Sequence, residues 1–238
     1  MGLEGEACLE RGEVKNAHSI TRDFEAALCE YTGAPYAVAV NSCTMALLLA
    51  VRWFIHRAQL ERFGATDIGL PPEVSIPKRT YVSVPMSIIH AGGKPVFDDR
   101  NWLGYYQLLP LPVFDCARWF SAGMYDFDPP WRADGGYDGN MLCVSFHSSK
   151  ILSDTQGGAI LHDNKEADAW FRRARFDGRA EGVSPKDDKF DIMGWHCYIS
   201  PDVSTRLLLK LSVLPKDNEP LPNDDYPDLS LIKWSEML

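Results

Sequence analysis

The sequence lacks features that would place it in several common protein classes. Its six cysteines include no Cys-x-x-Cys pair, and several of them lie in apolar runs. We therefore expect buried free thiols in a reducing compartment rather than zinc ligands or disulfides, and no metal site. The chain also lacks an excess of positive charge. Its formal net charge is −9, which argues against nucleic-acid binding through a basic surface.

Long apolar runs are missing as well. No stretch is long enough to cross a membrane, and the acidic residues 1–6 do not contain the apolar core of a signal peptide. We expect a cytoplasmic protein with no membrane partner. Apolar residues nevertheless make up 45% of the 238 residues. That share is enough for a substantial core, in one large domain or two small ones.

Apolar runs without period-2 alternation follow amphipathic segments along the chain. This pattern predicts an α/β fold in which helices bury both faces of a mostly parallel sheet. The predicted strands cover 36–40, 74–77, 95–97, 111–115, 141–146 and 158–162. The predicted helices cover 24–32, 44–63, 80–90 and the stretch from a capping box at 163–166 to Gly178. We expect an α/β domain at 1–214 and a Pro/Asp-rich tail at 215–238. Within this tail, residues 215–227 should be extended over a surface or partly disordered, and a short segment at 229–238 should follow.

Lys150 lies in the most informative stretch of the chain. The predicted buried strand at 141–146 leads through Ser145 into a loop that carries Lys150, and Gly157 and Gly158 follow. A lysine forms imines with carbonyl groups when its amine is partly desolvated or lies near another cation, because its pKa then falls. Most lysines are solvated surface groups, so the significance of Lys150 depends on what lies upstream.

Three upstream features could belong to the same site. Residues 41–44 join a strand to a helix, where free N–H groups and hydroxyls bind phosphate, although an ordinary Ser N-cap explains them equally. Asp115 ends a strand; it either faces a cation, such as a pyridinium nitrogen, or caps a helix that begins near Ala117. Tyr81 could stack on a planar cofactor or pack in the core. Together with Lys150 these features, in this chain order, meet the needs of pyridoxal phosphate (PLP).

Five blocks of sequence carry a resemblance that covers most of residues 22–211. They are Phe-Glu with Tyr-Thr-Gly and Asn-Ser-Cys-Thr-Met-Ala-Leu at 24–47, Ile-Pro with Gly-Gly-Lys-Pro-Val-Phe-Asp at 76–98, Asp-Cys-Ala-Arg at 115–118, Ser-Phe-His-Ser-Ser-Lys with Gly-Gly-Ala at 145–159, and Gly-Trp-His-Cys-Tyr at 194–198. These blocks resemble the DegT/DnrJ/EryC1/StrS family of PLP-dependent sugar aminotransferases. The resemblance implies the large domain of the aspartate-aminotransferase-like fold (fold type I), with the small C-terminal domain reduced or absent after about Leu214.

The resemblance also implies an activity and a role for each site residue. The enzyme would move an amino group from glutamate to a nucleotide-linked keto-sugar, through an aldimine of PLP with Lys150, in a homodimer whose subunits share the active site. Asp115 would keep the ring nitrogen protonated. The other cofactor-binding residues would be Ser42, Cys43, Thr44 and Ser145 at the phosphate, Tyr81 on the ring, Arg118 near the ring oxygen, His147 in the lysine block, and His196 reaching the neighbouring subunit's phosphate.

The chain departs from the family at several positions. Cys43 replaces a glycine, His196 an asparagine, Tyr198 an arginine, and Arg118 a glutamine or histidine. The family has a further strand and helix between residues 98 and 113. Two alternatives stay open: a PLP enzyme acting on a larger substrate, such as a modified nucleotide or nucleic-acid base, and a non-catalytic remnant of the fold. Lys150 favours transamination, because a dehydratase branch of the family lacks the lysine.

Overall fold

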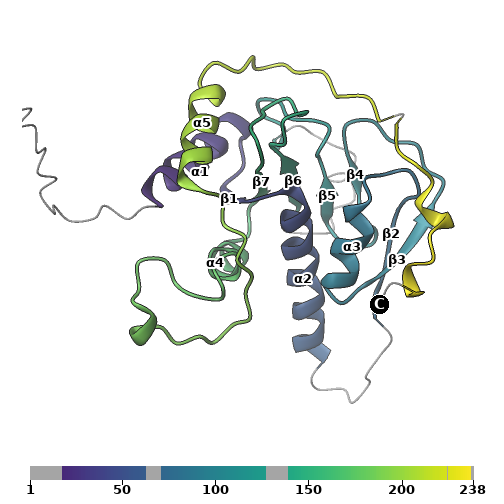
Figure 1. Ribbon diagram of the computed structural model, residues 1–238, viewed down its shortest axis with the longest axis horizontal. Coiled ribbons are helices and arrows are strands. Elements are labelled where there is room, and N and C mark those ends of the chain that lie inside the picture. The colour runs from purple at the N-terminus through teal and green to yellow at the C-terminus, as the bar shows by residue number, and fades with distance from the viewer. Residues whose placement is uncertain (1–17, 63–70, 127–138, 224, 237–238) are drawn as a thin grey trace, which may run out of the picture.

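A five-stranded sheet forms the centre of the protein (Figure 1). The computed structural model describes residues 18–62, 71–126, 139–223 and 225–236. The strand order is β1 (Tyr36–Val40), β7 (Gly158–His162), β6 (Met141–Ser145), β5 (Val113–Asp115) and β4 (Tyr106–Gln107). Every residue of β5, β6 and β7 is buried. Burial on both faces explains why these strands read as continuous apolar runs.

The sheet is mixed, so the prediction of a mostly parallel sheet is wrong. Within it only β5 and β6 run parallel, whereas β1–β7, β6–β7 and β4–β5 are antiparallel pairs. An apolar run indicates that a strand is buried on both faces, but it does not indicate the direction of the neighbouring strand. Residues 146–157 connect β6 to β7 and contain no helix, and β7 runs antiparallel to β6.

A second, two-stranded sheet joins the first at its β4 edge. β2 (Glu73–Pro77) and β3 (Lys94–Asp98) are parallel and connected by α3 (Ser83–His90). The backbones of Ser75 in β2 and Leu109, just after β4, exchange two hydrogen bonds of 2.8 and 3.0 Å. The short strand β4, which the sequence did not predict, thus lies in the stretch where the family has an additional strand and helix.

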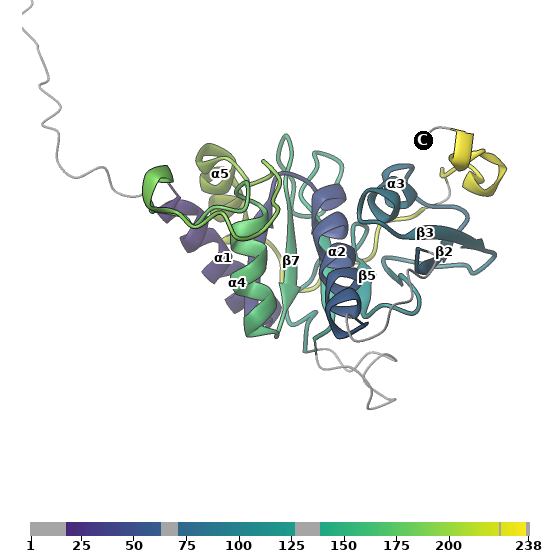
Figure 2. The same cartoon turned by 90° about the horizontal axis from the view of Figure 1, so that it is seen from below.

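Helices cover both faces of the five-stranded sheet. α1 (Ser19–Thr32) packs against α5 (Pro201–Leu211), and α2 (Cys43–Arg62) packs against α3 and α4 (Lys165–Ala174). Alternate residues of β1 belong to different hydrophobic clusters. Val38 and Val40 face the α2 side, and Ala37 and Ala39 face the α1 side. Figure 2 shows β7 between α1 and α2. None of the helices in the described residues has the length and apolar character that a membrane span requires.

Most predicted elements are confirmed, with differences at some ends. α1 ends as expected, because Gly33 adopts the left-handed conformation with φ 81°. The capping box predicted at 163–166 is wrong by one residue. Asn164 is the N-cap and accepts from the Ala167 amide, so an alanine, not a glutamate, stands where the reciprocal acceptor would be. Helix α5 was not predicted, and the predicted helix end at Phe63 lies outside the described residues.

Most of the cysteines in the described residues are buried. Cys43, Cys116, Cys143 and Cys197 are buried free thiols, and Cys29 is partly buried. Burial raises the pKa of these thiols, to about 12 at Cys197. Such thiols are poor nucleophiles at neutral pH. Cys8 lies outside the described residues.

The C-terminal segment runs from the end of α5 across the molecule to the side of β2 and β3 (Figure 1). The Leu221 amide donates to the Arg118 carbonyl, and the Leu229 amide to the Lys78 carbonyl, both at 2.8 Å. Leu229 is buried, and the Trp234 ring stacks on Phe97. The predicted extended course holds for the described residues of 215–227, which contain no helix or strand, and short 3-10 helices follow at Leu229–Leu231 and Trp234–Glu236. The division into a domain at 1–214 and a tail at 215–238 stays a prediction.

A buried ion cluster connects α1, β1 and α4. Glu25 is 3% exposed and accepts hydrogen bonds from the Ala39 amide at 2.9 Å and from Arg172 at 2.6 Å. It also pairs with Arg175, which is 1% exposed and binds Glu181 at 2.9 Å. Removing one member of such a cluster leaves the others buried without their partner.

Replacing Glu25 with alanine should therefore destabilise the protein strongly. We expect the free energy of unfolding to fall by about 3–5 kcal/mol, because the Arg175 guanidinium loses a buried counter-ion. Asp23, exposed on the same helix, is the matched control, and Asp23→Ala should change stability by less than about 0.5 kcal/mol. Urea denaturation measures both values. Similar losses for the two variants would contradict this account.

Candidate active site

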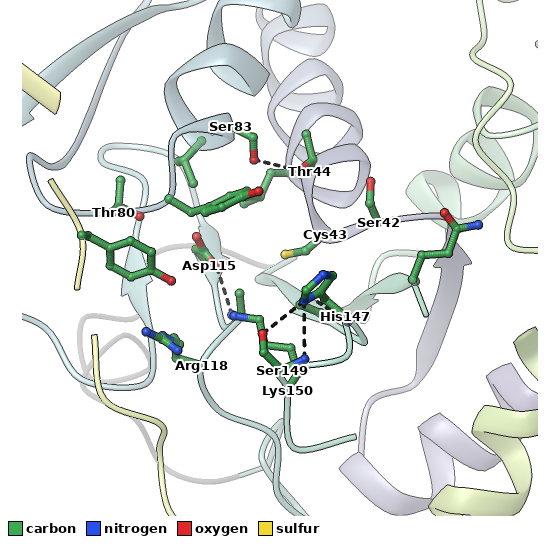
Figure 3. Close-up of a pocket in the computed structure, with 18 of the residues that line it drawn as sticks. Ser42, Cys43, Thr44, Thr80, Ser83, Asp115, Arg118, His147, Ser149 and Lys150 are labelled. Carbon is green, nitrogen blue, oxygen red and sulfur yellow. Dashed lines mark hydrogen bonds between the residues drawn. The ribbon is translucent and has the colours of Figure 1, made fainter. Parts of the chain in front are cut away.

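A pocket of about 320 Å³ lies where the carboxyl ends of β5 and β6 meet the N-terminus of α2 (Figure 3). It brings together all the predicted site residues except one. They are Ser42, Cys43, Thr44, Tyr81, Asp115, Arg118, Ser145, His147 and Lys150. The exception is His196, whose side chain is 70% exposed and binds Asp177 at 2.8 Å. Its predicted contact with a neighbouring subunit stays a prediction.

The first turn of α2 forms one wall of the pocket. Ser42 precedes the helix, and its hydroxyl accepts from the Met45 amide at 3.3 Å, which is the N-cap contact that the sequence allowed. Ser42, Cys43 and Thr44 also face the pocket, so this end of the helix offers hydroxyls, free N–H groups and the positive end of its dipole. The N-cap and the anion-binding interpretations are therefore compatible.

Gly158 allows β7 to approach this turn closely. A Cβ atom at position 158 would lie 2.5 Å from the Cys43 nitrogen and 2.6 Å from the Ser42 carbonyl carbon. These neighbours are backbone atoms, which cannot rotate away. The glycine at the start of β7 therefore sets the position of the α2 N-terminus relative to the sheet.

Asp115 is a buried carboxylate at the end of β5. It is 4% exposed, and its Oδ1 accepts from the Ala117 amide at 2.9 Å. Residues 117 and 118 form a turn, so the helix expected near Ala117 is wrong. Burial raises the pKa of the Asp115 carboxyl, and the hydrogen bonds and the charge of Lys150 oppose that rise. Among the described residues no side chain forms a salt bridge with it within 4.0 Å.

Tyr106 holds the other oxygen of Asp115, and sequence reasoning missed it. The two residues face each other across the β4–β5 pair, and the Tyr106 hydroxyl donates to Asp115 Oδ2 at 2.8 Å. The Thr80 hydroxyl lies 2.6 Å from the tyrosine oxygen and completes a buried chain of three groups. A two-residue strand has no periodicity to detect, so nothing in the sequence signalled this contact.

Lys150 is partly buried in the same pocket. Its loop begins with a turn in which the Lys150 amide donates to the His147 carbonyl at 2.9 Å, and His147 Nδ1 lies 3.1 Å from the Ser149 hydroxyl. Burial and, next, the charge of Arg118 lower the pKa of the Lys150 amine, and Asp115 opposes this shift. A lowered pKa increases the neutral, nucleophilic fraction of the amine.

The outer wall of the pocket combines the predicted residues Tyr81 and Arg118 with two residues that the sequence did not indicate. Tyr81 is 57% exposed at the rim. Asp225 and Tyr226 reach the pocket from the C-terminal segment. Arg118 pairs with Asp225 at 2.9 Å and lies 5.1 Å from the centre of the Tyr226 ring. Among the described residues no group of His, Cys, Asp and Glu side chains is arranged to hold a metal ion.

Comparison with known proteins shows a likeness to one family of aminotransferases. Residues 4–105 match the sequence model of the DegT/DnrJ/EryC1/StrS aminotransferase family. The spore coat polysaccharide biosynthesis protein SpsC of Bacillus subtilis is 40% identical over 78 residues, which are 33% of this chain and 17% of SpsC. The dTDP-3-amino-3,6-dideoxy-alpha-D-galactopyranose transaminase of Aneurinibacillus thermoaerophilus is 32% identical over 38% of this chain and 22% of that enzyme.

Solved structures of family members and other aminotransferases share the fold. The sugar aminotransferase CalS13 of Micromonospora echinospora matches with a TM-score of 0.60 at 18% identity, over 82% of this chain and 61% of CalS13. The aminotransferase PseC of Helicobacter pylori matches with a TM-score of 0.60 at 20% identity, over 82% of this chain and 58% of PseC. The expected large-domain fold of the PLP-dependent aminotransferases is confirmed. The matched regions span about a fifth of those curated relatives and about three fifths of those solved chains.

Tyr106→Phe tests the support of Asp115 without a cofactor. A hydrogen bond to a charged group contributes about 1.5–3 kcal/mol, and its loss should raise the pKa of the Asp115 carboxyl further. A carboxyl whose pKa is raised on folding costs stability as the pH rises through that pKa. We therefore expect Tyr106→Phe to lower the free energy of unfolding more at about pH 8 than at about pH 4, close to the pKa of a free aspartate.

Thr32→Val is the control for this measurement. Thr32 is also buried, but its hydroxyl donates to the Leu28 carbonyl at 2.7 Å. The loss of stability should be similar at both pH values, because a backbone carbonyl does not titrate. Denaturant unfolding at the two pH values gives both results, and an equal loss at both for Tyr106→Phe would argue against a role at Asp115.

Proposed function

We propose that the chain binds PLP and acts as an aminotransferase, with Lys150 as the residue that binds the cofactor covalently. One observation carries the proposal. The pocket brings Lys150 and the buried carboxylate of Asp115 together beside the N-terminus of α2. The family match and the aminotransferase fold support this assignment. A lysine, a carboxylate and an anion-binding helix end are the groups that PLP requires.

The pocket residues fit the cofactor at three points. Asp115 forms no salt bridge with any described side chain, so its charge would be stabilised by a protonated ring nitrogen. The first turn of α2 and Ser145 would hold the phosphate, and Tyr81, exposed at the rim, would cover the ring. Bound PLP supplies an aldehyde that captures amines and a ring that stabilises negative charge on the neighbouring carbon.

The protein's own residues would bind and orient the cofactor and transfer a proton. The Lys150 nitrogen would act first as nucleophile and then, once released, as the base and acid that moves a proton at the substrate carbon. Burial and the charge of Arg118 lower the pKa of this amine, which increases the neutral fraction that can attack or accept a proton. Asp115 would stay ionised opposite a cation, held in place by Tyr106 and the Ala117 amide. The intact Lys150–Asp115 pair disfavours a non-catalytic remnant.

The substrates are proposed by likeness to the relatives. The similar protein from Aneurinibacillus thermoaerophilus is named as the transaminase of a dTDP-linked amino sugar, and that from Caulobacter vibrioides as GDP-perosamine synthase. We propose a nucleotide-linked keto-sugar as acceptor and glutamate as donor. We also propose a cytoplasmic homodimer in which His196 contacts the neighbouring subunit's cofactor.

The absorbance spectrum of the purified protein tests the cofactor assignment. We expect added PLP to produce a visible band that sodium borohydride removes, and glutamate to convert this band to one in the near ultraviolet. Lys150→Ala should abolish the band, because no other amine lines the pocket among the described residues. The exposed Lys186 is the control, and Lys186→Ala should keep it. A full band in Lys150→Ala would contradict the assignment.

Gly158→Ala tests the phosphate-binding end. The added methyl group would displace the backbone of residues 42 and 43, so we expect PLP affinity to fall about tenfold or more, which corresponds to about 1.4 kcal/mol. Gly93→Ala is the control, since its methyl group would meet Ile88 and Ile55 away from the pocket, at 3.0 and 3.3 Å. Absorbance titration gives both affinities. Normal affinity in Gly158→Ala would refute the role of this turn.

A further inference from the structure

Arg118 is a partly buried cation that lines the pocket, and only part of its hydrogen-bonding capacity is used. Its side chain is 14% exposed. Its Nε is buried and has no hydrogen-bond partner among the described residues. Nη2 donates to Asp225 at 2.9 Å, and the guanidinium lies over the Tyr226 ring. Because a guanidinium carries five donors in a rigid fork, this group is built to bind more than one oxygen.

The carboxylate that pairs with Arg118 comes from an exposed part of the chain. The Asp225 side chain is 75% exposed and belongs to the C-terminal segment, which the Leu221 amide and the Asn223 side chain attach to residues 118 and 102. An ion pair with one largely solvated partner is weak. A ligand carboxylate inside the pocket could therefore replace Asp225 and keep the guanidinium paired.

We propose that Arg118 binds the carboxylate of the amino-acid substrate, and that Asp225 occupies this position in the free chain. The inference rests on the proposed function. Arg118 and Lys150 line the same pocket, and the charge of Arg118 acts on the Lys150 amine. In an α-amino acid the carboxylate is one carbon away from the amine that reacts. The diphosphate of a nucleotide sugar is separated from the reacting carbon by part of the sugar ring, so a carboxylate fits this cation better.

Arg118 is also a departure of this chain. The resemblance places a glutamine or histidine at this position, and neither carries the permanent charge and planar fork that bind a carboxylate in two places. Tyr198 replaces an arginine of the family pattern, so the chain has lost one cation and gained another. The gained cation is the one that faces the pocket.

Calorimetry with α-methyl-L-glutamate tests the proposal, because this amino acid cannot lose an α-hydrogen and so is not turned over. We expect Arg118→Gln to weaken its binding at least tenfold and Asp225→Asn to strengthen it severalfold, since the internal competitor loses its charge.

dTDP serves as the diphosphate probe, and Arg118→Gln should leave its affinity nearly unchanged. The ion pair of Arg57 with Glu166, 2.7 Å long and exposed, provides the controls. Arg57→Gln and Glu166→Gln should leave both affinities unchanged.

Two results would overturn the proposal: unchanged binding of α-methyl-L-glutamate in Arg118→Gln, or weakened binding of dTDP alone. Thermal unfolding of Arg118→Gln checks that the variant is folded, and Arg118→Lys, which keeps the charge without the fork, should recover only part of the affinity. All titrations are made with and without PLP. A chain that shows no cofactor band but loses amino-acid binding in Arg118→Gln would keep this inference and refute the proposed function.

Discussion

The burial of the Asp115 carboxylate is the constraint around which the pocket is built. Asp115 is only 4% exposed at the end of a central strand. Its carboxylate therefore needs hydrogen-bond donors from the protein in place of water. The chain supplies the Ala117 amide and the Tyr106 hydroxyl, and the latter is held by Thr80. The tyrosine lies in β4, and the threonine lies between β2 of the second sheet and α3. Strand β4 therefore forms the edge of the sheet and also supplies a hydrogen-bond donor to the carboxylate.

The close approach of strand and helix at Gly158 is the second requirement. A glycine lets β7 contact the backbone of residues 42 and 43, and this contact directs the first turn of α2 towards the pocket. The two requirements act at the same edge of the sheet. One places a negative charge at the end of β5, and the other places the positive end of a helix dipole across the pocket from it. Lys150 lies in the same pocket, from the loop after β6.

Much of this could be predicted from local sequence. The strands at 36–40 and 158–162 and the helix ending at Gly33 follow from apolar runs and from the conformational freedom of glycine. The chain order of Thr44, Tyr81, Asp115 and Lys150 by itself indicates a cofactor site. Strand direction was predicted wrongly, because burial on both faces produces the same apolar run in parallel and antiparallel strands. The cap of α4 was placed one residue early, because Asp163 and Asn164 are both good N-caps.

Local sequence accounts for the chemical groups at the strand ends, because buried strands and the polar residues after them are local features. Which of these groups meet depends on how the elements pack. The pairing of Tyr106 with Asp115 depends on the register of a two-residue strand, and the contact of Asp225 with Arg118 joins residues 107 positions apart. His196, predicted to reach the phosphate of a neighbouring subunit, lies outside the pocket of this chain and pairs with Asp177. Long-range contacts of this kind leave no periodic signal, since they follow from how whole elements pack.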